Sequence, residues 1–228
     1  MTNYTQWKSL VDLHEYSAIP DSIVENFAHF YILDNEDTLT DAIGDGPDID
    51  VDGPTLVEDD DAPFGQYLDF DSNDELVAED TNLDFSEVST FVWYQTGEPS
   101  GTKNILGVST TEEFRSDDGW HFRDLEDEFS WVIVPGIDSL EVDISDTSEW
   151  LMNSGTYSSG TSNIYAYQES GFEGDGSRSA DFELGSDPDI FVGDEANGFT
   201  GNIACFGIVE DELGKDTFDD VFDDTTPN

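Results

Sequence analysis

The chain has 228 residues, and its 55 Asp and Glu against only 6 Lys and Arg give a formal net charge of -49. Binding to phosphate groups requires clustered Lys and Arg, whereas the six basic residues here are scattered singly. We therefore do not expect the protein to bind nucleic acid or anionic membrane surfaces. The chain is nevertheless 36% hydrophobic and 13% aromatic, which is enough to bury a core and argues against disorder.

The acidic residues run from Asp12 to Asp224 and spare no segment, so they are not a tail attached to an ordinary domain. Carboxylates this dense repel one another unless salt screens them, and the Debye length is about 8 Å at physiological ionic strength but about 3 Å in molar salt. We therefore expect synthesis in the salt-rich cytoplasm of a halophilic archaeon, from a gene of the archaeon or of its virus. No basic segment followed by an apolar one opens the chain, and no run approaches a membrane span, so we expect neither a signal peptide nor membrane insertion.

Residues 1–22 differ in character from the rest of the chain. Four apolar residues there have the spacing of a short helical stripe, which ends at the break at Pro20. These candidate interface residues are Trp7, Leu10, Val11 and Leu13. A stripe this short cannot bury itself alone, so we predict an N-terminal arm that docks on its own domain or on a neighbouring molecule.

From residue 23 to residue 228, short aromatic and β-branched runs alternate with clusters of Gly, Asp, Asn, Ser and Pro, which is the pattern of antiparallel strands. Residues 34–63 are the least hydrophobic part, and we expect a long, partly irregular connection there. The runs are FAHFYI, QYLDF, STFVWYQ, KNILGV, GWHFRD, FSWVIV, SLEVDI, EWLMNSGTY, NIYAYQ, DIFVG and NIACFGIVE. Strands this short and numerous predict one all-β domain of two packed antiparallel sheets.

Two stretches carry a resemblance to a known family. EWLMNSGTYSSGTSNIYAYQESG has a Trp, a strand ending in Gly-Thr-Tyr, a hairpin with Gly and a second strand; DIFVGDEANGFTGNIACFGIVEDELGKDTFDDVF has a glycine-rich turn, a long strand and a short acidic segment. Together with earlier runs in the expected order, they resemble the laminin-G-like branch of the concanavalin A-like jelly rolls over roughly residues 23–226. The resemblance implies a two-sheet antiparallel jelly-roll sandwich with a short N-terminal arm and a short acidic helix after the last long strand. It also implies binding of glycans or proteins, often with Ca²⁺ at one rim.

Glucanases of the same jelly-roll class place three carboxylates on one strand, and Glu141, Asp143 and Asp146 come close to that spacing. Strand alternation puts Glu141 and Asp143 on one face, but the third position holds the shorter Asp where a general acid is needed. Such spacing arises by chance in a chain this acidic. We therefore expect no enzymatic activity, and a laminarinase-type glycoside hydrolase is kept as an alternative.

Two kinds of binding residue can be named from the sequence. Carboxylate and amide oxygens suited to Ca²⁺ or Mg²⁺ occur at a strand-to-turn junction and after a later strand, although neither place matches the twelve-residue calcium loop. These candidate metal ligands are Asp71, Asn73, Asp74 and Asp194. Glycan binding needs exposed aromatic rings, for which the candidates are Trp120, Trp131, Tyr165 and Tyr167.

The resemblance to an extracellular binding fold, combined with the missing export signal, leads to a specific functional hypothesis. We predict a non-enzymatic virion surface protein of a virus of halophilic archaea, a capsid decoration, turret or tail-fibre module that stabilises the particle or binds host surface glycans. Its N-terminal arm would hold other virion proteins, and we expect a homo-oligomer. A cellular, extracellular glycan-binding or adhesion module, exported by a route that the sequence hides, is the alternative.

Overall fold

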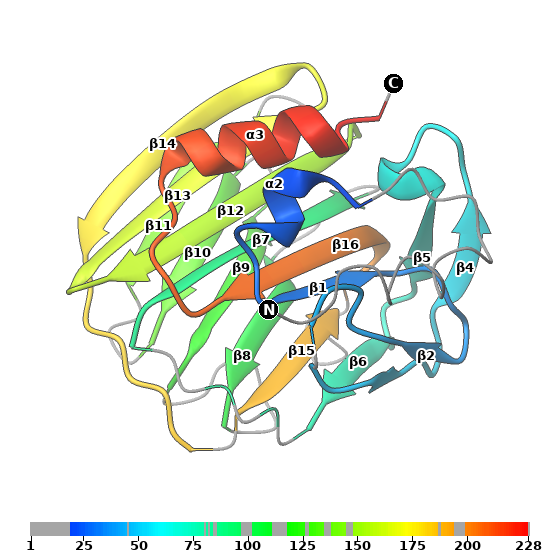
Figure 1. Ribbon diagram of the computed structural model, residues 1–228, viewed down its shortest axis with the longest axis horizontal. Helices are drawn as coiled ribbons and strands as arrows, with labels where there is room; N and C mark the ends of the chain where they lie inside the picture. Colours follow the sequence, from blue (N-terminus) through cyan, green and yellow to red (C-terminus); the bar gives the residue numbers. More distant parts are fainter. Residues whose placement is uncertain are drawn as a thin grey trace.

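The computed structural model describes residues 19–44, 46–79, 81, 83, 86–96, 102–110, 118–125, 128–134, 138–144, 148–186, 188–193 and 199–227. Two antiparallel sheets pack face to face, with two helices on the outside of one of them (Figure 1). The predicted all-β, two-sheet jelly-roll sandwich is therefore confirmed. Within the described parts of the chain, no helix is long and apolar enough to cross a membrane.

The larger sheet has eight strands among the described residues. Its main path is β14 (Gly171–Ser179), β13 (Thr161–Gln168), β12 (Leu151–Ser158), β7 (Val88–Thr96), β16 (Gly201–Val209), β5 (Gln66–Phe70) and β4 (Thr55–Glu58). The eighth strand, β1 (His29–Ile32), also pairs with β16. The first residues of β16 pair with β5 and the later ones with β1, while its whole length pairs with β7 on the other side. The last strand of the described chain thus lies inside the sheet and joins three earlier strands.

The smaller sheet has six strands in the described residues and packs against the inner face of the larger one. Its order is β11 (Asp138–Asp143), β10 (Glu128–Ile133), β9 (Trp120–Leu125), β8 (Thr102–Ser109), β15 (Asp189–Gly193) and β6 (Glu75–Ala78). Two further strands, β2 (Thr38–Leu39) and β3 (Ile49–Asp50), pair with each other, and η2 (Pro63–Gly65) is a single 3-10 turn. The predicted irregular connection at residues 34–63 therefore contains three short strands, β2, β3 and β4.

The main core fills the space between the sheets, where strand alternation directs every second side chain inward. Trp120 and Trp131 stack there with ring centroids 5.0 Å apart, and Phe122 lies 4.6 Å from the Trp131 ring. Gly155 on the opposite sheet lies directly beneath Trp131, since an added Cβ would be 2.6 Å from two indole carbons. The absence of a side chain at Gly155 therefore sets how closely the sheets approach at this point.

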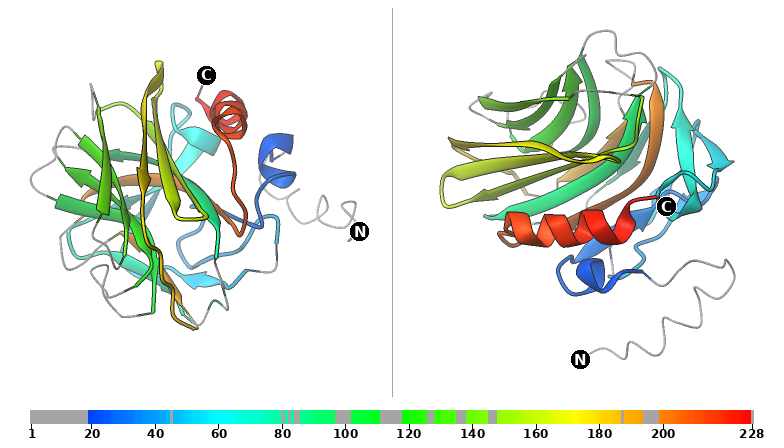
Figure 2. Two further views of the ribbon diagram at one scale, coloured as in Figure 1. Left: turned by 90° about the vertical axis from the view of Figure 1, so that its left-hand side faces the viewer. Right: turned by 90° about the horizontal axis from the view of Figure 1, so that it is seen from above.

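A second core covers the outer face of the larger sheet. Helix α3 (Lys215–Thr225) buries Phe218, Val221 and Phe222 against this face, and the short helix α2 (Asp21–Val24) packs beside it (Figure 2). Trp93 stacks on Phe222 at 5.7 Å and donates a 2.7 Å hydrogen bond to Thr225 Oγ1. The helical segment expected after the final strand is confirmed, and it covers part of the outer face of the larger sheet.

The predicted arm reaches only partly into the described residues. Its four candidate interface residues, Trp7, Leu10, Val11 and Leu13, lie outside them. The predicted boundary between residues 22 and 23 falls inside α2, whose Ile23 is buried in the second core.

Candidate functional site

A strip of aromatic and charged side chains lies at the edge of the larger sheet, where α3 begins beside β13 and β14. Strand pairing places Phe172 opposite Tyr167 and Asp175 opposite Tyr165. Directly opposite residues of an antiparallel pair share one face, so these four side chains lie on the outer face of the sheet. We call this surface the α3–β14 strip; it consists of Tyr165, Tyr167, Phe172, Asp175, Glu212, Lys215 and Asp219.

The aromatic part of the strip contains an exposed ring. Phe172 is 42% exposed, more than any other large hydrophobic side chain in the described residues. Its ring meets Tyr167 edge-on at 5.3 Å, and Tyr167 is itself only 1% exposed. The half-buried Tyr165 packs 5.6 Å from Phe218 of α3. Phe172 therefore presents an apolar face to solvent and is supported from below by a buried ring.

The charged part of the strip is built around Lys215. Its Nζ lies 4.1 Å from the centroid of the Phe172 ring, which is a cation–π distance. The same Nζ lies 2.5 Å from Asp219 Oδ1, and this oxygen also accepts a 3.0 Å hydrogen bond from the Tyr167 hydroxyl. The ion pair with Asp219, which the Tyr167 hydroxyl also binds, therefore holds the Lys215 ammonium group over the Phe172 ring.

Both tyrosines of the strip keep their protons at neutral pH. Burial raises the pKa of Tyr165, and the negative charges of Asp175 and Glu212 raise it further. Burial, followed by the hydrogen bond and the charge of Asp219, raises the pKa of Tyr167 well above its usual value. The Tyr165 and Tyr167 hydroxyls are therefore neutral hydrogen-bond donors.

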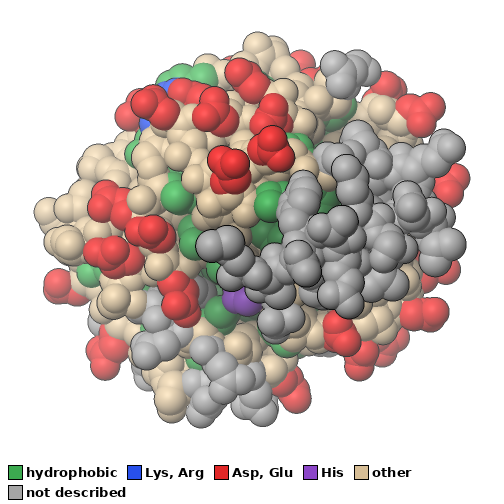
Figure 3. All heavy atoms as spheres, in the orientation of Figure 1, with side chains coloured by type: hydrophobic (Ala, Val, Ile, Leu, Met, Phe, Trp, Pro, Cys, Tyr) green, Lys and Arg blue, Asp and Glu red, His purple; other side chains and the backbone are tan. Residues whose placement is uncertain are grey.

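Lys215, whose side chain is 37% exposed, brings a positive charge to a face on which carboxylates predominate among the described residues. Figure 3 shows red carboxylates spread over this face, with Lys and Arg atoms at the upper left beside hydrophobic side chains. In the same orientation, that region is where α3 begins beside β14 (Figure 1). An apolar ring next to carboxylates and hydroxyl donors is an arrangement that binds sugars, whose rings have both an apolar face and a rim of hydroxyl groups.

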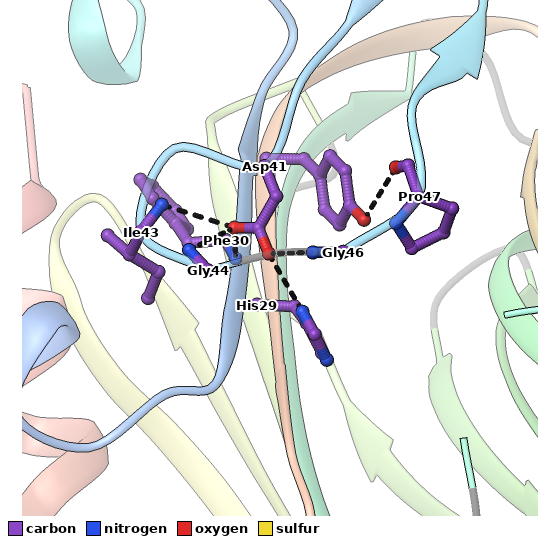
Figure 4. A network of polar contacts seen from close by, with 8 residues as sticks. His29, Phe30, Asp41, Ile43, Gly44, Gly46 and Pro47 are labelled. Carbon is purple, nitrogen blue, oxygen red and sulfur yellow. Dashed lines mark hydrogen bonds and ion pairs between the residues drawn. The ribbon is translucent and has the colours of Figure 1, made fainter. Parts of the chain in front are cut away.

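A separate polar cluster anchors the connection between β1 and β3 (Figure 4). Asp41 is 7% exposed, and its carboxylate accepts hydrogen bonds from the backbone N–H groups of Phe30, Ile43, Gly44 and Gly46. His29 Nδ1 lies 2.7 Å from Asp41 Oδ2. Burial alone raises the pKa of Asp41, but the hydrogen bonds from His29 and the backbone outweigh it and hold the pKa below its usual value. All these contacts are internal, so the cluster orders the loop.

The structure separates the four aromatic residues that were predicted to bind a ligand. Tyr165 and Tyr167 lie in the α3–β14 strip, whereas Trp120 and Trp131 are 1% and 0% exposed and form the centre of the main core. These two tryptophans therefore present no face to a ligand, because packing between the sheets uses both rings. The sequence prediction missed Phe172, which lies in a strand that was not recognised.

Three of the four predicted metal ligands, Asp71, Asn73 and Asp74, lie in the turn between β5 and β6. Asp74 Oδ2 accepts a 2.7 Å hydrogen bond from the backbone N–H of Asp71, and the Asp74 N–H bonds to the Asp71 carbonyl, so these residues, with Asn73 between them, close the turn from β5 to β6. Asp194 lies outside the described residues, although its neighbour Gly193 pairs with Glu75. In the described part of the chain, no three His, Cys, Asp or Glu side chains are grouped so as to hold a metal. Binding of Ca²⁺ or Mg²⁺ stays a prediction.

The carboxylates considered for catalysis lie on β11, the edge strand of the smaller sheet. Glu141 and Asp143 are exposed on its outward face, and Ser139 donates a 2.8 Å hydrogen bond to Glu141. Val142 points inward and is 8% exposed, as the alternation of the sequence predicted. Asp146 lies outside the described residues.

Comparisons with known proteins support the fold. No protein-family model matches the chain, and no curated protein matches it either. Among solved structures, it is similar to HCR/D carrying a tryptophan-to-alanine substitution, with a TM-score of 0.67 and 16% identity over 89% of this chain and 53% of that one. It is also similar to the sialidase of Trypanosoma rangeli, with a TM-score of 0.66 and 11% identity over 96% of this chain and 37% of that one.

A third similar structure is the binding domain of botulinum neurotoxin DC in complex with SialylT, with a TM-score of 0.63 and 13% identity over 88% of this chain and 52% of that one. The chain therefore spans about half or less of the length of each of these proteins. At such low identity, the likeness shows a shared β-sandwich fold.

Proposed function

We propose that this protein is a non-enzymatic glycan-binding β-sandwich module and that the α3–β14 strip is its binding surface. The observation that carries the proposal is the exposed Phe172 ring, held next to Lys215 in a surface otherwise crowded with carboxylates. An exposed aromatic ring bordered by hydrogen-bonding groups offers a sugar an apolar surface to pack on and partners for its hydroxyl groups. The neighbouring Asp175 and the hydroxyl of Tyr165 supply hydrogen-bonding groups of the kind a sugar requires.

The similar structures support this choice of ligand. One is a toxin's binding domain solved with SialylT, and the Trypanosoma rangeli sialidase is also known in complex with sialic acid. This chain corresponds to 52% of the toxin's binding domain and to 37% of the sialidase.

Loss of the exposed ring tests the proposal. We expect Phe172→Ala to weaken glycan binding about tenfold, since losing an aromatic contact of about 1.4 kcal/mol corresponds to that factor. Binding would be measured by calorimetric titration in strong salt with the best ligand from a glycan array. Val57→Ala is the matched control, because Val57 is half-buried on the outer face of the same sheet at its opposite edge. Equal loss in both variants, or no binding to any glycan by the unchanged protein, would reject the proposed site.

The proposal that the protein is not an enzyme has its own test. Glu141 lies on an exposed edge strand, and its carboxylate already accepts a hydrogen bond from Ser139. We expect no release of reducing sugar from β-glucan. If the unchanged protein released reducing sugar from β-glucan and Glu141→Gln did not, the glycoside hydrolase alternative would be established instead.

The setting proposed for this module is the virion surface of a virus of halophilic archaea, where it would stabilise the particle or contact host glycans. The support is compositional: a net charge of -49 on a folded domain suits molar salt, where carboxylate repulsion is screened. Mass spectrometry of purified virions would find the protein if this setting is correct, and a size measurement in strong salt would show the proposed homo-oligomer. Recovery from host cells but never from virions would favour the cellular adhesion alternative.

A further inference from the structure

We propose that the α3–β14 strip prefers uncharged sugars to sugars that carry a carboxylate, most strongly where salt does not screen its charges. This inference rests on the proposed glycan-binding function and specifies the ligand class of the same surface. It also distinguishes this protein from the similar sialidase, which is known with bound sialic acid.

The positive charge of Lys215 is already paired within the protein. Its Nζ lies 2.5 Å from Asp219 Oδ1 and 4.1 Å from the Phe172 ring. The side chains of Lys215 and Asp219 are 37% and 41% exposed, so both charges stand at the surface side by side. A ligand carboxylate that approached Lys215 would also meet Asp219, and the net attraction of this ion pair for an anion is close to zero.

The remaining charges of the strip are negative. Asp175 and Glu212 lie close enough to Tyr165 to raise its pKa, and Asp175 also acts on Tyr167. Two like charges 4 Å apart weaken binding about fivefold in bulk water, and by a larger factor at the effective dielectric constant of a protein surface. One ligand carboxylate seated among these side chains is therefore disfavoured about tenfold or more.

The same side chains can make favourable contacts with an uncharged sugar. Its ring can pack on Phe172, and its hydroxyl groups can donate to Asp175, Glu212 or the outer oxygen of Asp219, because ionised carboxylates only accept hydrogen bonds. The neutral hydroxyl of Tyr165 can donate in return. The carboxylates that repel an acidic sugar are thus acceptors for a neutral one.

Salt should separate these two kinds of ligand. At about 3 M salt the Debye length is only about 2 Å, so repulsion between exposed charges is largely screened. We expect the affinity for a neutral sugar to change little between about 0.5 M and about 3 M potassium chloride, while the affinity for a carboxylated sugar rises with salt. Circular dichroism at each concentration would confirm that the protein stays folded.

The experiment uses an array of neutral oligosaccharides, each paired with its sialylated counterpart, followed by titration of the best pair. We expect the neutral member to bind at least about tenfold more tightly at the lower salt concentration. Equal or tighter binding of the sialylated member would overturn the inference and leave the proposed function standing. Binding of neither member of any pair would overturn the proposed function itself.

A charge variant tests the role of the ion pair. Asp219→Asn leaves Lys215 without its carboxylate partner, so we expect the preference for the neutral sugar to fall about fivefold or more. Asp220→Asn is the matched control, since it removes the same charge from an exposed position on the same helix outside the strip, and should keep the preference. An unchanged preference in Asp219→Asn, or an equal fall in both variants, would overturn the assignment to this ion pair.

Discussion

Replacing Asp41 by Asn is expected to lower the free energy of unfolding by about 3 kcal/mol. The buried carboxylate accepts hydrogen bonds from four backbone N–H groups and lies 2.7 Å from His29 Nδ1. Asn removes the charge and turns one acceptor oxygen into an NH₂ group that faces these donors. Because the donors belong to β1 and to the loop after Asp41, their loss of partners would release the connection that leads into β3.

The same site gives a pH dependence of known sign. The pKa of Asp41 lies below its usual value in the folded protein, so its contribution to stability is complete above the unfolded pKa of about 3.9 and is lost as the pH falls through the folded pKa. The stability difference between the unchanged protein and Asp41→Asn should therefore be constant above about pH 5 and shrink below about pH 4. Because both proteins contain the same other carboxylates, the contributions of these groups to the pH dependence cancel in the difference.

Denaturant unfolding in strong salt measures this difference, with Asp60→Asn as the control. Asp60 is exposed in the same connection, residues 34–63, so the loss of its charge should change the free energy of unfolding by less than about 0.5 kcal/mol. If Asp41→Asn were as mild as the control, the network of Figure 4 would not anchor the loop.

The second large effect is expected at Gly155, where a single added methyl group should cost about 2 kcal/mol. A Cβ at this position would be 2.6 Å from two carbons of the Trp131 indole, far inside van der Waals contact. Trp131 cannot move aside easily, since it is fully buried and stacked on Trp120. Gly155→Ala therefore forces the sheets apart locally, although Ala is otherwise more favourable than Gly in a strand.

Gly176→Ala is the matched control for this prediction. Gly176 also faces the interior from the larger sheet, but its added Cβ would be 3.2 Å from Ile164 Cγ2 and 3.6 Å from Leu140 Cδ2, so a shift of a few tenths of an ångström would admit it. We expect its stability to stay within about 0.5 kcal/mol of the unchanged protein in thermal or denaturant unfolding. Similar losses at both positions would mean that sheet spacing is not limited by the tryptophan.

Strand patterning in the sequence was sufficient to predict the architecture. GWHFRD and FSWVIV became β9 and β10, because their aromatic and β-branched residues alternate between the core and the outer face. The resemblance to jelly rolls added the order of the strands and the helical segment after β16. Neither the pattern nor the resemblance showed that Trp120 and Trp131 are buried. Alternation indicates which side chains share one face of a strand, but it does not indicate whether that face packs against the other sheet or lies in solvent.

The candidate site was only half predictable. Tyr165 and Tyr167 were named from the sequence. Phe172 was missed because it lies in GFEGDGSRS, whose three glycines are typical of a loop, so that β14 was not predicted as a strand. Gly174 lies close to β11 of the other sheet, since an added Cβ would be 2.9 Å from Val142. Lys215 reaches Phe172 only because α3 folds back over the sheet, a contact between residues 43 positions apart that no local pattern encodes.

The position of β16 also determines the order in which the protein can fold. β7, β5 and β1 are synthesised long before β16, yet each needs it as a hydrogen-bonding neighbour, and Trp93 reaches its partner Thr225 across 132 residues of chain. Until β16 leaves the ribosome, these strands have open edges and an uncovered apolar face. Topology of this kind favours slow, late-closing folding in which nearly all of the described chain must be present before either core is complete.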